Sequence, residues 1–498
     1  MKNKGQEFPL NDANLKFKQN IFPSDWKNPK PQEIYDLVVI GGGPGGMTAA
    51  TIARSFNAKV AIVEKEHFGG ECLTSGCIPS KAMLRSSRLA AEVKSAASFG
   101  IEIPKGWKVN FPQVMERVQR LQTTISPHDS PEHFKNLGID VFLGAGHFKS
   151  HNTLEVAGQT LKFKKALVVT GTEPIALTVP GLDPSDYLTN QNIFTLTALP
   201  KRLAVIGGGP ISCELSQAFL RFGSQVTLIT RGNHLLPKDD PTATERLQIV
   251  LEKEGMKLFF GSQVTRVEKR GKEKVLYLDK YSEPIVCDEI LVAIGRAPVV
   301  QGLGLDAAGV VHDPKKGILT DEYLQTSNPN IYASGDVTSA YKFTHISQEL
   351  AKMAVENALN NGKLKKSSLI IPWSTYTDPE IAHTGLNEKE AEEQGILTET
   401  LMIEMENVDR AILDGETIGF AKLLIRAGTD ELIGATIMAR HAGDMISELT
   451  VAIASQKGLS ALSHAIHPFP TQAQIVRSGA EALLKIAAKG GAKRAQNF

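Results

Sequence analysis

The chain has 498 residues, 42% of them hydrophobic, and carries 55 Lys and Arg against 54 Asp and Glu. At about 150 residues per domain, this length predicts about three domains and excludes a small scaffold held together by disulfides. The net charge of +1 provides no long-range field that would attract nucleic acid or an anionic membrane, so we expect neither as a partner.

The amino-terminal residues 1–32 are polar and are interrupted by Pro9, Pro23, Pro29 and Pro31. This pattern predicts an arm that lies outside the first domain. The arm has no apolar signal core, and no apolar run in the chain approaches the roughly 18 to 20 residues of a membrane helix. We therefore expect a cytoplasmic protein without a membrane partner.

A strand, a glycine turn, a helix and a second strand are predicted between residues 35 and 64. Residues 36–40 form a continuous apolar run, which is typical of a buried parallel strand. An Ala-rich helical stretch follows to residue 56, and residues 60–63 supply the second strand. This order is that of a dinucleotide-binding unit.

The turn of this unit has the spacing Gly41-x-Gly43-x-x-Gly46, and Glu64 stands at the end of the second strand. Glycines at this spacing let a pyrophosphate approach the N-terminus of the helix, and the carboxylate can accept a hydrogen bond from a ribose hydroxyl. A glycine-rich turn with only a structural role is the alternative. The agreement of strand, spacing and acid favours a binding site.

Cys72 and Cys77 form a close pair, whereas Cys213 and Cys287 stand alone and are predicted to be small buried hydrophobes. Five residues of regular helix rise about 7.5 Å, more than the roughly 7 Å limit between bridged Cα atoms. A disulfide in the pair therefore requires a distorted backbone, which Gly76 permits. Cys77 then begins a helix whose dipole stabilises a thiolate. Half of a metal site is the alternative, but no second Cys/His cluster of suitable spacing exists, so we expect no metal.

A second copy of the unit follows, with a strand at 203–206, the turn Gly207-x-Gly209-x-x-Ser212 and a strand at 225–229. The serine stands where a third glycine would allow close packing of the helix. Two nucleotide-binding domains are therefore predicted.

The second strand of this copy ends at Thr230 and Arg231 rather than at an acid. A guanidinium at this point suits a 2′-phosphate, and the absence of a carboxylate removes repulsion toward it. The pair therefore favours NADPH over NADH. A solvated surface residue is the alternative interpretation of Arg231.

A third domain, of α+β type, is predicted beyond a polar boundary at 360–368. A helical segment at 346–359 precedes this boundary, and the domain contains strands such as 421–425 and helices such as 444–455. The predicted fold is therefore α/β, with two Rossmann-like domains and a C-terminal α+β domain.

The sequence GGECLTSGCIPSK at 69–81, with GGGPGG at 41–46 and ASGD at 333–336, resembles the FAD-dependent pyridine nucleotide-disulfide oxidoreductases. The likeness extends over nearly the whole chain after about residue 33. It implies FAD and NAD(P)H domains, a C-terminal dimerisation domain and a homodimer. The implied limits are an arm at 1–32, an FAD domain at 33–174 and 296–366, an NAD(P)H domain at 175–295, a dimerisation domain at 367–485 and a tail at 486–498.

The resemblance also implies roles for individual residues. Cys77 would face the flavin as the charge-transfer thiol, and Cys72 would exchange with the substrate as the interchange thiol. Lys81 would sit near flavin N5, paired with Glu214, although solvated helix charges are the alternative for both. The positions that match the family's cofactor contacts are Gly41, Gly43, Gly46, Glu64, Gly70, Lys81, Thr170, Gly171, Asp336, Gly207, Gly209, Thr230, Arg231 and Gly295.

A physical account fits these implied roles. Hydride passes from NADPH to one face of the flavin, and electrons leave on the other face to the Cys77 sulfur, which gives a dithiol with Cys72. Lys81 favours the anionic reduced flavin, and Glu214 holds its ammonium group. A helix that starts near residues 343–345 resembles the family helix whose positive end points at the flavin.

The segment HPFPTQAQ at 467–474 departs from the family's disulfide reductases, which carry His-Pro-Thr and a Glu that orients the His. Either Phe469 replaces the His and Gln474 the Glu, or His467 is retained and Gln472 replaces the Glu. In both matches we expect the acid to be missing, and a neutral amide cannot stabilise an imidazolium. An interface residue is the alternative role for His467.

The Phe-Pro-Thr version is similar to mercuric reductase, whose thiolate-bound metal ion needs no proton relay. The tail at 492–498 nevertheless lacks the cysteine pair that delivers Hg(II) in that enzyme, and Pro210 stands where glutathione reductase has a gating Tyr. The resemblance thus implies a mercuric reductase-like enzyme that passes electrons from NADPH through FAD to the cysteine pair and on to a metal-ion or small-molecule acceptor. A dihydrolipoamide dehydrogenase-like or other disulfide reductase and a slow-cycling flavin redox sensor are the alternatives.

Overall fold

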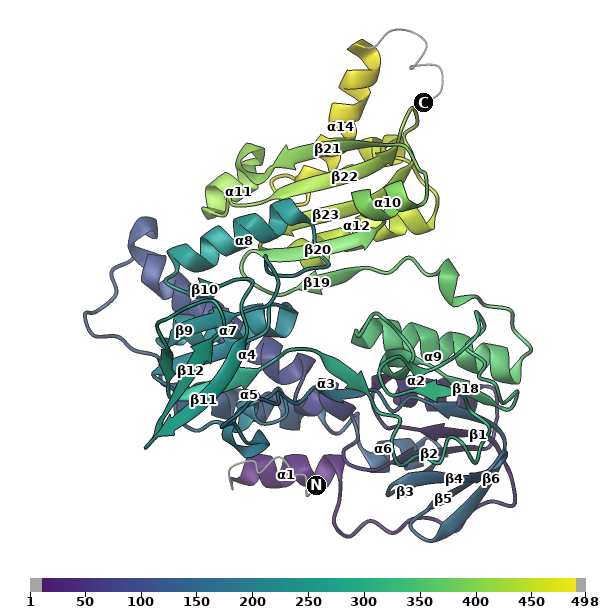
Figure 1. Ribbon diagram of the computed structural model, residues 1–498. Coiled ribbons are helices and arrows are strands. Elements are labelled where there is room, and N and C mark those ends of the chain that lie inside the picture. The colour runs from purple at the N-terminus through teal and green to yellow at the C-terminus, as the bar shows by residue number, and fades with distance from the viewer. Residues whose placement is uncertain (1–10, 490–498) are drawn as a thin grey trace. The chain divides into compact units, whose positions relative to one another are not determined.

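The computed structural model describes residues 11–489, and the chain divides into two compact units (Figure 1). The first unit comprises Met1–Gly207, Arg221–Gln225 and Gln263–Leu369, and the second comprises Gly208–Leu220, Val226–Ser262 and Ile370–Phe498. The first ten residues of the predicted arm, and the predicted tail from residue 490 onward, lie outside the described residues. The limits of the individual domains stay a prediction.

The core of the first unit is a seven-stranded sheet of order β3-β2-β1-β6-β5-β4, in which β18 also pairs with β6 (Figure 1). The pairs among β1, β2, β3, β6 and β18 are parallel, as the buried apolar run at 36–40 predicts, whereas β5 is antiparallel to both of its neighbours. The strands are β1 (Tyr35–Ile40), β2 (Val60–Glu64), β3 (Asp140–Leu143), β4 (Gly146–Ser150), β5 (Thr153–Val156), β6 (Gln159–Val168) and β18 (Ile331–Ala333).

Helices α2 (Pro44–Ser55) and α9 (Thr344–Leu359) pack against each other beside this sheet. The helix start predicted near residues 343–345 is confirmed. The other elements of the first unit are α1 (Asp12–Ile21), α3 (Gly70–Thr74), α4 (Cys77–Ser95), α5 (Phe111–Ile125), α6 (Pro131–Asn136), β7 (Thr172–Pro174), β8 (Arg202–Ile206), β11 (Val264–Arg270), β12 (Glu273–Leu278), β13 (Ile285–Cys287), β14 (Glu289–Val292), β15 (Arg296–Pro298), β16 (His312–Asp313) and β17 (Gly317–Ile318).

Part of the predicted arm is built into the first unit. Helix α1 buries Phe17 and Ile21, which pack against Leu73 of α3. The Nδ2 of Asn20 donates a hydrogen bond to the Oγ of Ser126 at 2.8 Å. The composition of the arm had indicated a linker outside the first domain. Its helical part instead packs within the first unit. The apolar spacing of four residues between Phe17 and Ile21 is the signal that the prolines obscured.

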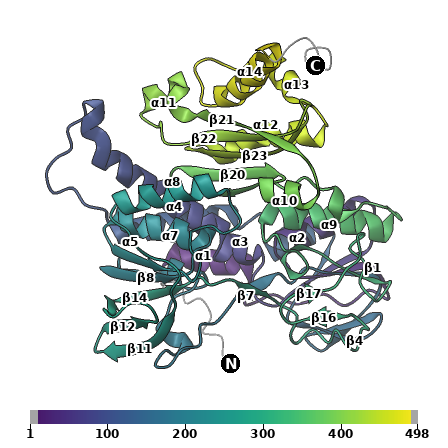
Figure 2. The ribbon, with the colours of Figure 1, turned by 45° about the horizontal axis from the view of Figure 1, so that its top comes forward.

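The second unit contains a five-stranded antiparallel sheet of order β19-β20-β23-β22-β21 (Figure 1; Figure 2 labels β20, β21, β22 and β23). Helix α12 packs on β20 and β23, and α14 packs on β21 and β22, which confirms the predicted α+β domain. The elements are α7 (Pro210–Phe222, its last two residues in the first unit), β9 (Gln225–Ile229), α8 (Pro241–Lys253), β10 (Lys257–Phe259), β19 (Trp373–Thr375), β20 (Glu380–Gly385), α10 (Glu388–Glu393), β21 (Thr398–Glu404), α11 (Asp409–Asp414), β22 (Phe420–Arg426), β23 (Leu432–Ala439), α12 (Ala442–Ala454), α13 (Leu459–His464) and α14 (Gln474–Lys489).

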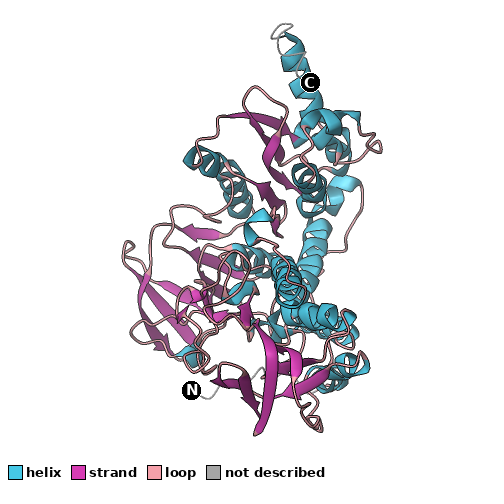
Figure 3. Ribbon diagram, turned by 90° about the vertical axis from the view of Figure 1, so that its right-hand side faces the viewer, coloured by secondary structure: helices cyan, strands magenta, loops and turns pink. Residues whose placement is uncertain are grey.

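Both units mix helices and strands, as the predicted α/β class requires (Figure 3). The second glycine unit follows the expected order along the chain, from β8 through α7 to β9. Strand β8 is parallel to β14 within the first unit, and β9 is parallel to β10. None of the helices between residues 11 and 489 is both long and apolar enough to cross a bilayer.

We predict that Phe17→Ala lowers the free energy of unfolding by about 3 to 5 kcal/mol, because it leaves a cavity where α1 meets α3. The ring of Phe17 is 1% exposed. Leu15→Ala in the same helix is the control, since that side chain is 54% exposed, and it should change the free energy by less than about 0.5 kcal/mol. Urea unfolding measures both, and equal effects would contradict the packing of α1.

Candidate functional site

The first glycine turn leaves backbone N–H groups open at the start of α2. A Cβ on Gly41 would lie 2.4 Å from the carbonyl oxygen of Val169, and a Cβ on Gly46 would lie 1.8 Å from the carbonyl oxygen of Gly41. A Cβ on Gly43 would have a single close neighbour, the Cα of Gly70 at 3.8 Å. Since Gly43 caps α2 without a side-chain hydrogen bond, the free N–H groups there can hold a phosphate.

Glu64 ends β2 beside this turn, where the spacing placed it. Its Oε2 accepts a hydrogen bond from the N–H of Gly42, and its Oε1 accepts one from the N–H of Glu66, both at 2.6 Å. Burial raises the pKa of this carboxyl group. Each oxygen keeps a further lone pair, so the side chain can also accept from a ribose hydroxyl.

The two cysteines lie on either side of a break between two helices. Cys72 is in α3, and Cys77 is the first residue of the 19-residue helix α4. Gly76 adopts φ −126° and ψ −117° between them, and a Cβ there would lie 2.7 Å from the carbonyl oxygen of Glu71. The predicted distorted backbone and the predicted helix start are therefore confirmed. The positive end of the α4 dipole acts on Cys77.

Thr344, the first residue of α9, lies against both sulfurs. Its Oγ1 is 3.3 Å from the Sγ of Cys72 and 3.3 Å from the Sγ of Cys77. A hydrogen bond with Cys77 raises the pKa of the Cys72 thiol far above its usual value, and burial adds to this rise. Cys72 is therefore protonated at neutral pH. Sequence reasoning missed Thr344 because no spacing signal links it to the cysteine motif.

A two-stranded ribbon brings two of the predicted turns together. Strand β7 follows Thr170 and Gly171, and it pairs antiparallel with β15, which follows Gly295. Gly171 and Gly295 have φ values of +70° and +131°, which glycine tolerates. The hydroxyl of Thr170 donates to the carbonyl oxygen of Val299 at 2.7 Å. Residues far apart in the chain thus meet at one ribbon.

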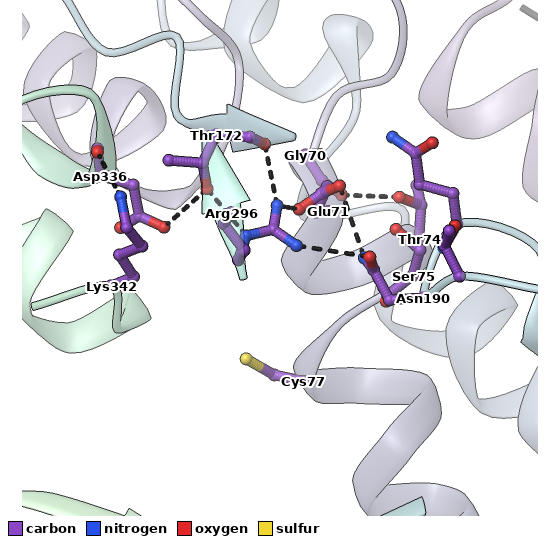
Figure 4. A network of polar contacts seen from close by, with 12 residues as sticks. Gly70, Glu71, Thr74, Ser75, Cys77, Thr172, Asn190, Arg296, Asp336 and Lys342 are labelled. Atoms are coloured by element: carbon purple, nitrogen blue, oxygen red, sulfur yellow. Dashed lines mark hydrogen bonds and ion pairs between the residues drawn. The ribbon is translucent and has the colours of Figure 1, made fainter. Parts of the chain in front are cut away.

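Arg296 is the centre of a polar network that connects this ribbon to α3 (Figure 4). Its Nε donates to the Oγ1 of Thr172 at 2.8 Å, its Nη1 donates to the Oδ1 of Asn190 at 3.4 Å, and its Nη2 pairs with Glu71. The hydroxyl of Thr172 also donates to Asp336 at 3.4 Å, and burial raises the pKa of Asp336. Sequence reasoning gave Glu71 and Asn190 no role.

The second glycine turn is open in the second unit. Thr230 is buried, and its hydroxyl lies against the turn. A Cβ on Gly208 would lie only 2.7 Å from the Oγ1 of Thr230. A Cβ on Gly209 would meet no atom within 4 Å, and Gly207 has φ +130°. Arg231 is exposed at the end of β9. The space beside Gly209 and the exposed guanidinium of Arg231 therefore suit an anionic ligand.

Lys81 and Glu214 belong to different units. Lys81 lies one turn after Cys77 in α4. Glu214 is buried in α7, and its Oε1 accepts a hydrogen bond from the N–H of Tyr376 at 2.9 Å. The pairing of Lys81 with Glu214 stays a prediction.

His467 has an acidic partner, but this acid is not the family's Glu, whose position within 467–474 is occupied by Gln472 or Gln474. The Nε2 of His467 lies 2.9 Å from the Oε1 and 3.2 Å from the Oε2 of Glu448 on α12. Gln472 does not orient this ring, because its amide donates to Glu416 at 2.7 Å, and Phe469 is 70% exposed. Glu448 precedes the His by 19 residues, outside the segment in which the family places its acid.

Comparison with known proteins agrees with this geometry. Residues 35–358 match the family described as pyridine nucleotide-disulphide oxidoreductase, and residues 371–479 match its dimerisation domain. The mercuric reductase of Staphylococcus aureus is 35% identical over 442 residues, which cover 88% of this chain and 81% of that protein. The dihydrolipoyl dehydrogenase of Chlamydia muridarum is 32% identical over 450 residues, or 89% of this chain and 95% of that protein. The HOCl-induced flavoprotein disulfide reductase RclA from Escherichia coli shares the fold, with a TM-score of 0.81 at 23% identity over 90% of this chain and 99% of that one.

We predict that iodoacetamide alkylates Cys72 of the reduced protein slowly at pH 8, because its raised pKa keeps the thiol protonated and only the thiolate attacks. Cys77→Ala removes the main cause of this rise and should speed alkylation of Cys72 by about tenfold or more. Mass spectrometry of the Cys72 peptide measures the rate. Cys287→Ala, at a cysteine in β13, is the control and leaves the rate unchanged. No acceleration in Cys77→Ala would refute the coupling of the two sulfurs.

Proposed function

Because this chain belongs to the pyridine nucleotide-disulphide oxidoreductase family, we propose that it passes electrons from NADPH to a Cys72–Cys77 disulfide and on to a metal-ion or small-molecule acceptor, as a mercuric reductase-like enzyme. The chain is an FAD-dependent NAD(P)H oxidoreductase, and its dimerisation domain supports a homodimer. The observation that carries the proposal is the convergence of both sulfurs on Thr344, each at 3.3 Å.

The residues of the first unit fit FAD. The open turn at Gly43 suits its pyrophosphate, and Glu64 suits its adenosine ribose. Asp336, which is half-buried and accepts a hydrogen bond from the hydroxyl of Thr172, suits the ribityl hydroxyls. FAD, when bound, accepts a hydride from nicotinamide and supplies two electrons to the disulfide.

The cysteine pair divides the chemistry between its two sulfurs. Reduction of the disulfide takes up two electrons and one proton when the Cys72 sulfur becomes a thiol and the Cys77 sulfur stays a thiolate. The start of α4 at Cys77 stabilises that negative charge. The Cys72 thiol keeps its proton until the acceptor arrives. Lys81, in the same helix as Cys77, supplies positive charge to the site, and Glu214 is the carboxylate proposed to hold its ammonium group.

NADPH is the proposed electron donor. Arg231 is exposed at the end of β9, next to an open glycine turn, and no acid stands there to repel a 2′-phosphate. The hydroxyl of Thr230 accepts from the N–H of Gly232 at 3.2 Å, which fixes the loop that carries the guanidinium.

Reduction of an organic disulfide is the second candidate, and the pair of His467 with Glu448 favours it. A carboxylate that holds an imidazole in one orientation lets the ring act as a general acid or base, so this pair can exchange a proton with a thiol leaving group. A bound metal ion would not need such a relay.

Anaerobic titration of the FAD-loaded protein with NADPH tests the proposal. We predict a long-wavelength charge-transfer band, which Cys77→Ala abolishes because the Cys77 thiolate is its donor. Turnover is then measured with Hg(II), lipoamide, glutathione disulfide and quinones. Hg(II) turnover that Cys72→Ser abolishes supports the mercuric reductase-like function, and faster lipoamide or glutathione turnover supports the second candidate. If no acceptor supports turnover, both enzymatic functions are refuted and the slow-cycling redox sensor is the remaining interpretation.

We predict that Arg231→Glu shifts the coenzyme preference toward NADH by at least about tenfold in kcat/KM, because a carboxylate repels the 2′-phosphate. Lys253→Glu, an equal change of charge at an exposed site in α8, is the control and leaves the preference unchanged. Steady-state rates with both coenzymes measure the shift. An unchanged preference in Arg231→Glu would refute the coenzyme assignment.

A further inference from the structure

We propose that Glu71 is a positioning residue whose ion pair with Arg296 fixes helix α3 and thereby sets the thiol–disulfide equilibrium of Cys72 and Cys77. The proposal rests on the function proposed above only in taking Cys72 and Cys77 as the redox pair. It concerns a carboxylate that the account of the reaction does not otherwise use.

Helix α3 cannot hold its own position. It has five residues, and helices of this length are unstable in water without tertiary contacts. Gly69 precedes it with φ +82°, its first residue Gly70 has φ +58°, and the break at Gly76 separates it from α4. The place of the Cys72 sulfur must therefore come from side chains that bind α3 to its surroundings.

The carbonyl end of α3 is bound by two amides. The Nε2 of Gln122 donates to the carbonyl oxygens of Leu73 and Thr74 at 2.8 and 2.9 Å, and the Nδ2 of Asn190 donates to that of Ser75 at 3.3 Å. These bonds satisfy carbonyls that a helix end leaves free. They leave the first turn, where Cys72 lies, to be held by other groups.

Glu71 binds this first turn to the ribbon of β7 and β15 (Figure 4). Its partner Arg296 is itself held, because the guanidinium donates to both the hydroxyl and the carbonyl oxygen of Thr172 at 2.8 Å. The side chains of Arg296 and Glu71 are 16% and 33% exposed, so solvent screens the pair only in part. A planar guanidinium fixed at several nitrogens is a rigid anchor for a carboxylate.

Loss of the Glu71 carboxylate favours the reduced pair because it loosens the first turn of α3. A loosened first turn brings the two sulfurs together less often, which disfavours the disulfide. This shifts the equilibrium toward the dithiol.

The test is the thiol–disulfide equilibrium of Glu71→Gln in the full-length, FAD-loaded protein, read in dithiothreitol redox buffers by thiol alkylation and mass spectrometry. We expect the equilibrium constant for reduction to rise about tenfold, which is about 30 mV for a two-electron couple. Glu132→Gln is the matched control, because Glu132 is exposed and pairs with Lys135 at 3.2 Å. Its constant should stay within twofold of wild type.

Conservative variants separate a positioning role from a general loss of stability. Glu71→Asp keeps the charge and should return the constant to within about threefold of wild type. If Glu71→Gln does not fold, Arg296→Lys is the alternative variant, because it keeps the positive charge but loses the planar guanidinium that binds several groups at once. It should raise the equilibrium constant for reduction by less than the tenfold expected for Glu71→Gln. An unchanged constant in the folded Gln or Lys variant would overturn the proposal. A wild-type protein that forms no Cys72–Cys77 disulfide would instead overturn the proposed function.

Discussion

The break between α3 and α4 is the constraint on which the rest of the site depends. A continuous helix through residues 72–77 would hold the two Cα atoms about 7.5 Å apart, beyond the reach of a disulfide. The helix is interrupted at Gly76, and the break requires glycine because a side chain there would collide with the carbonyl oxygen of Glu71. The break lets both sulfurs face Thr344, and it leaves α3 so short that its position depends on neighbouring side chains.

The charges around the pair are arranged asymmetrically. Cys77 receives the positive end of α4, whereas the hydrogen bond between the two sulfurs keeps the proton on Cys72. Glu71 and Arg296 neutralise each other on the Cys72 side. The arrangement places negative charge on the Cys77 sulfur and leaves Cys72 as a thiol. These states suit electron transfer at Cys77 and exchange with the acceptor at Cys72.

The parts of this site that follow local rules were predictable from the sequence. The glycine turn at residues 41–46, Glu64 at the end of a strand and the helix start at Cys77 each depend on the residue's own segment. Thr344 and Glu448 were not predictable, because only the fold brings them to Cys77 and His467. Helix α1 was mistaken for a linker because composition weighs its polar residues and neighbouring prolines above the two apolar side chains that it buries.

A crystal structure of the FAD-loaded protein, solved oxidised and again after reduction with NADPH, tests the central claim most directly. The account predicts a bond between the Sγ atoms of Cys72 and Cys77 beside one face of the isoalloxazine ring, and two separate, unbonded sulfur atoms after reduction. Sulfurs that lie away from the flavin, or that remain unbonded under oxidising conditions, would contradict it.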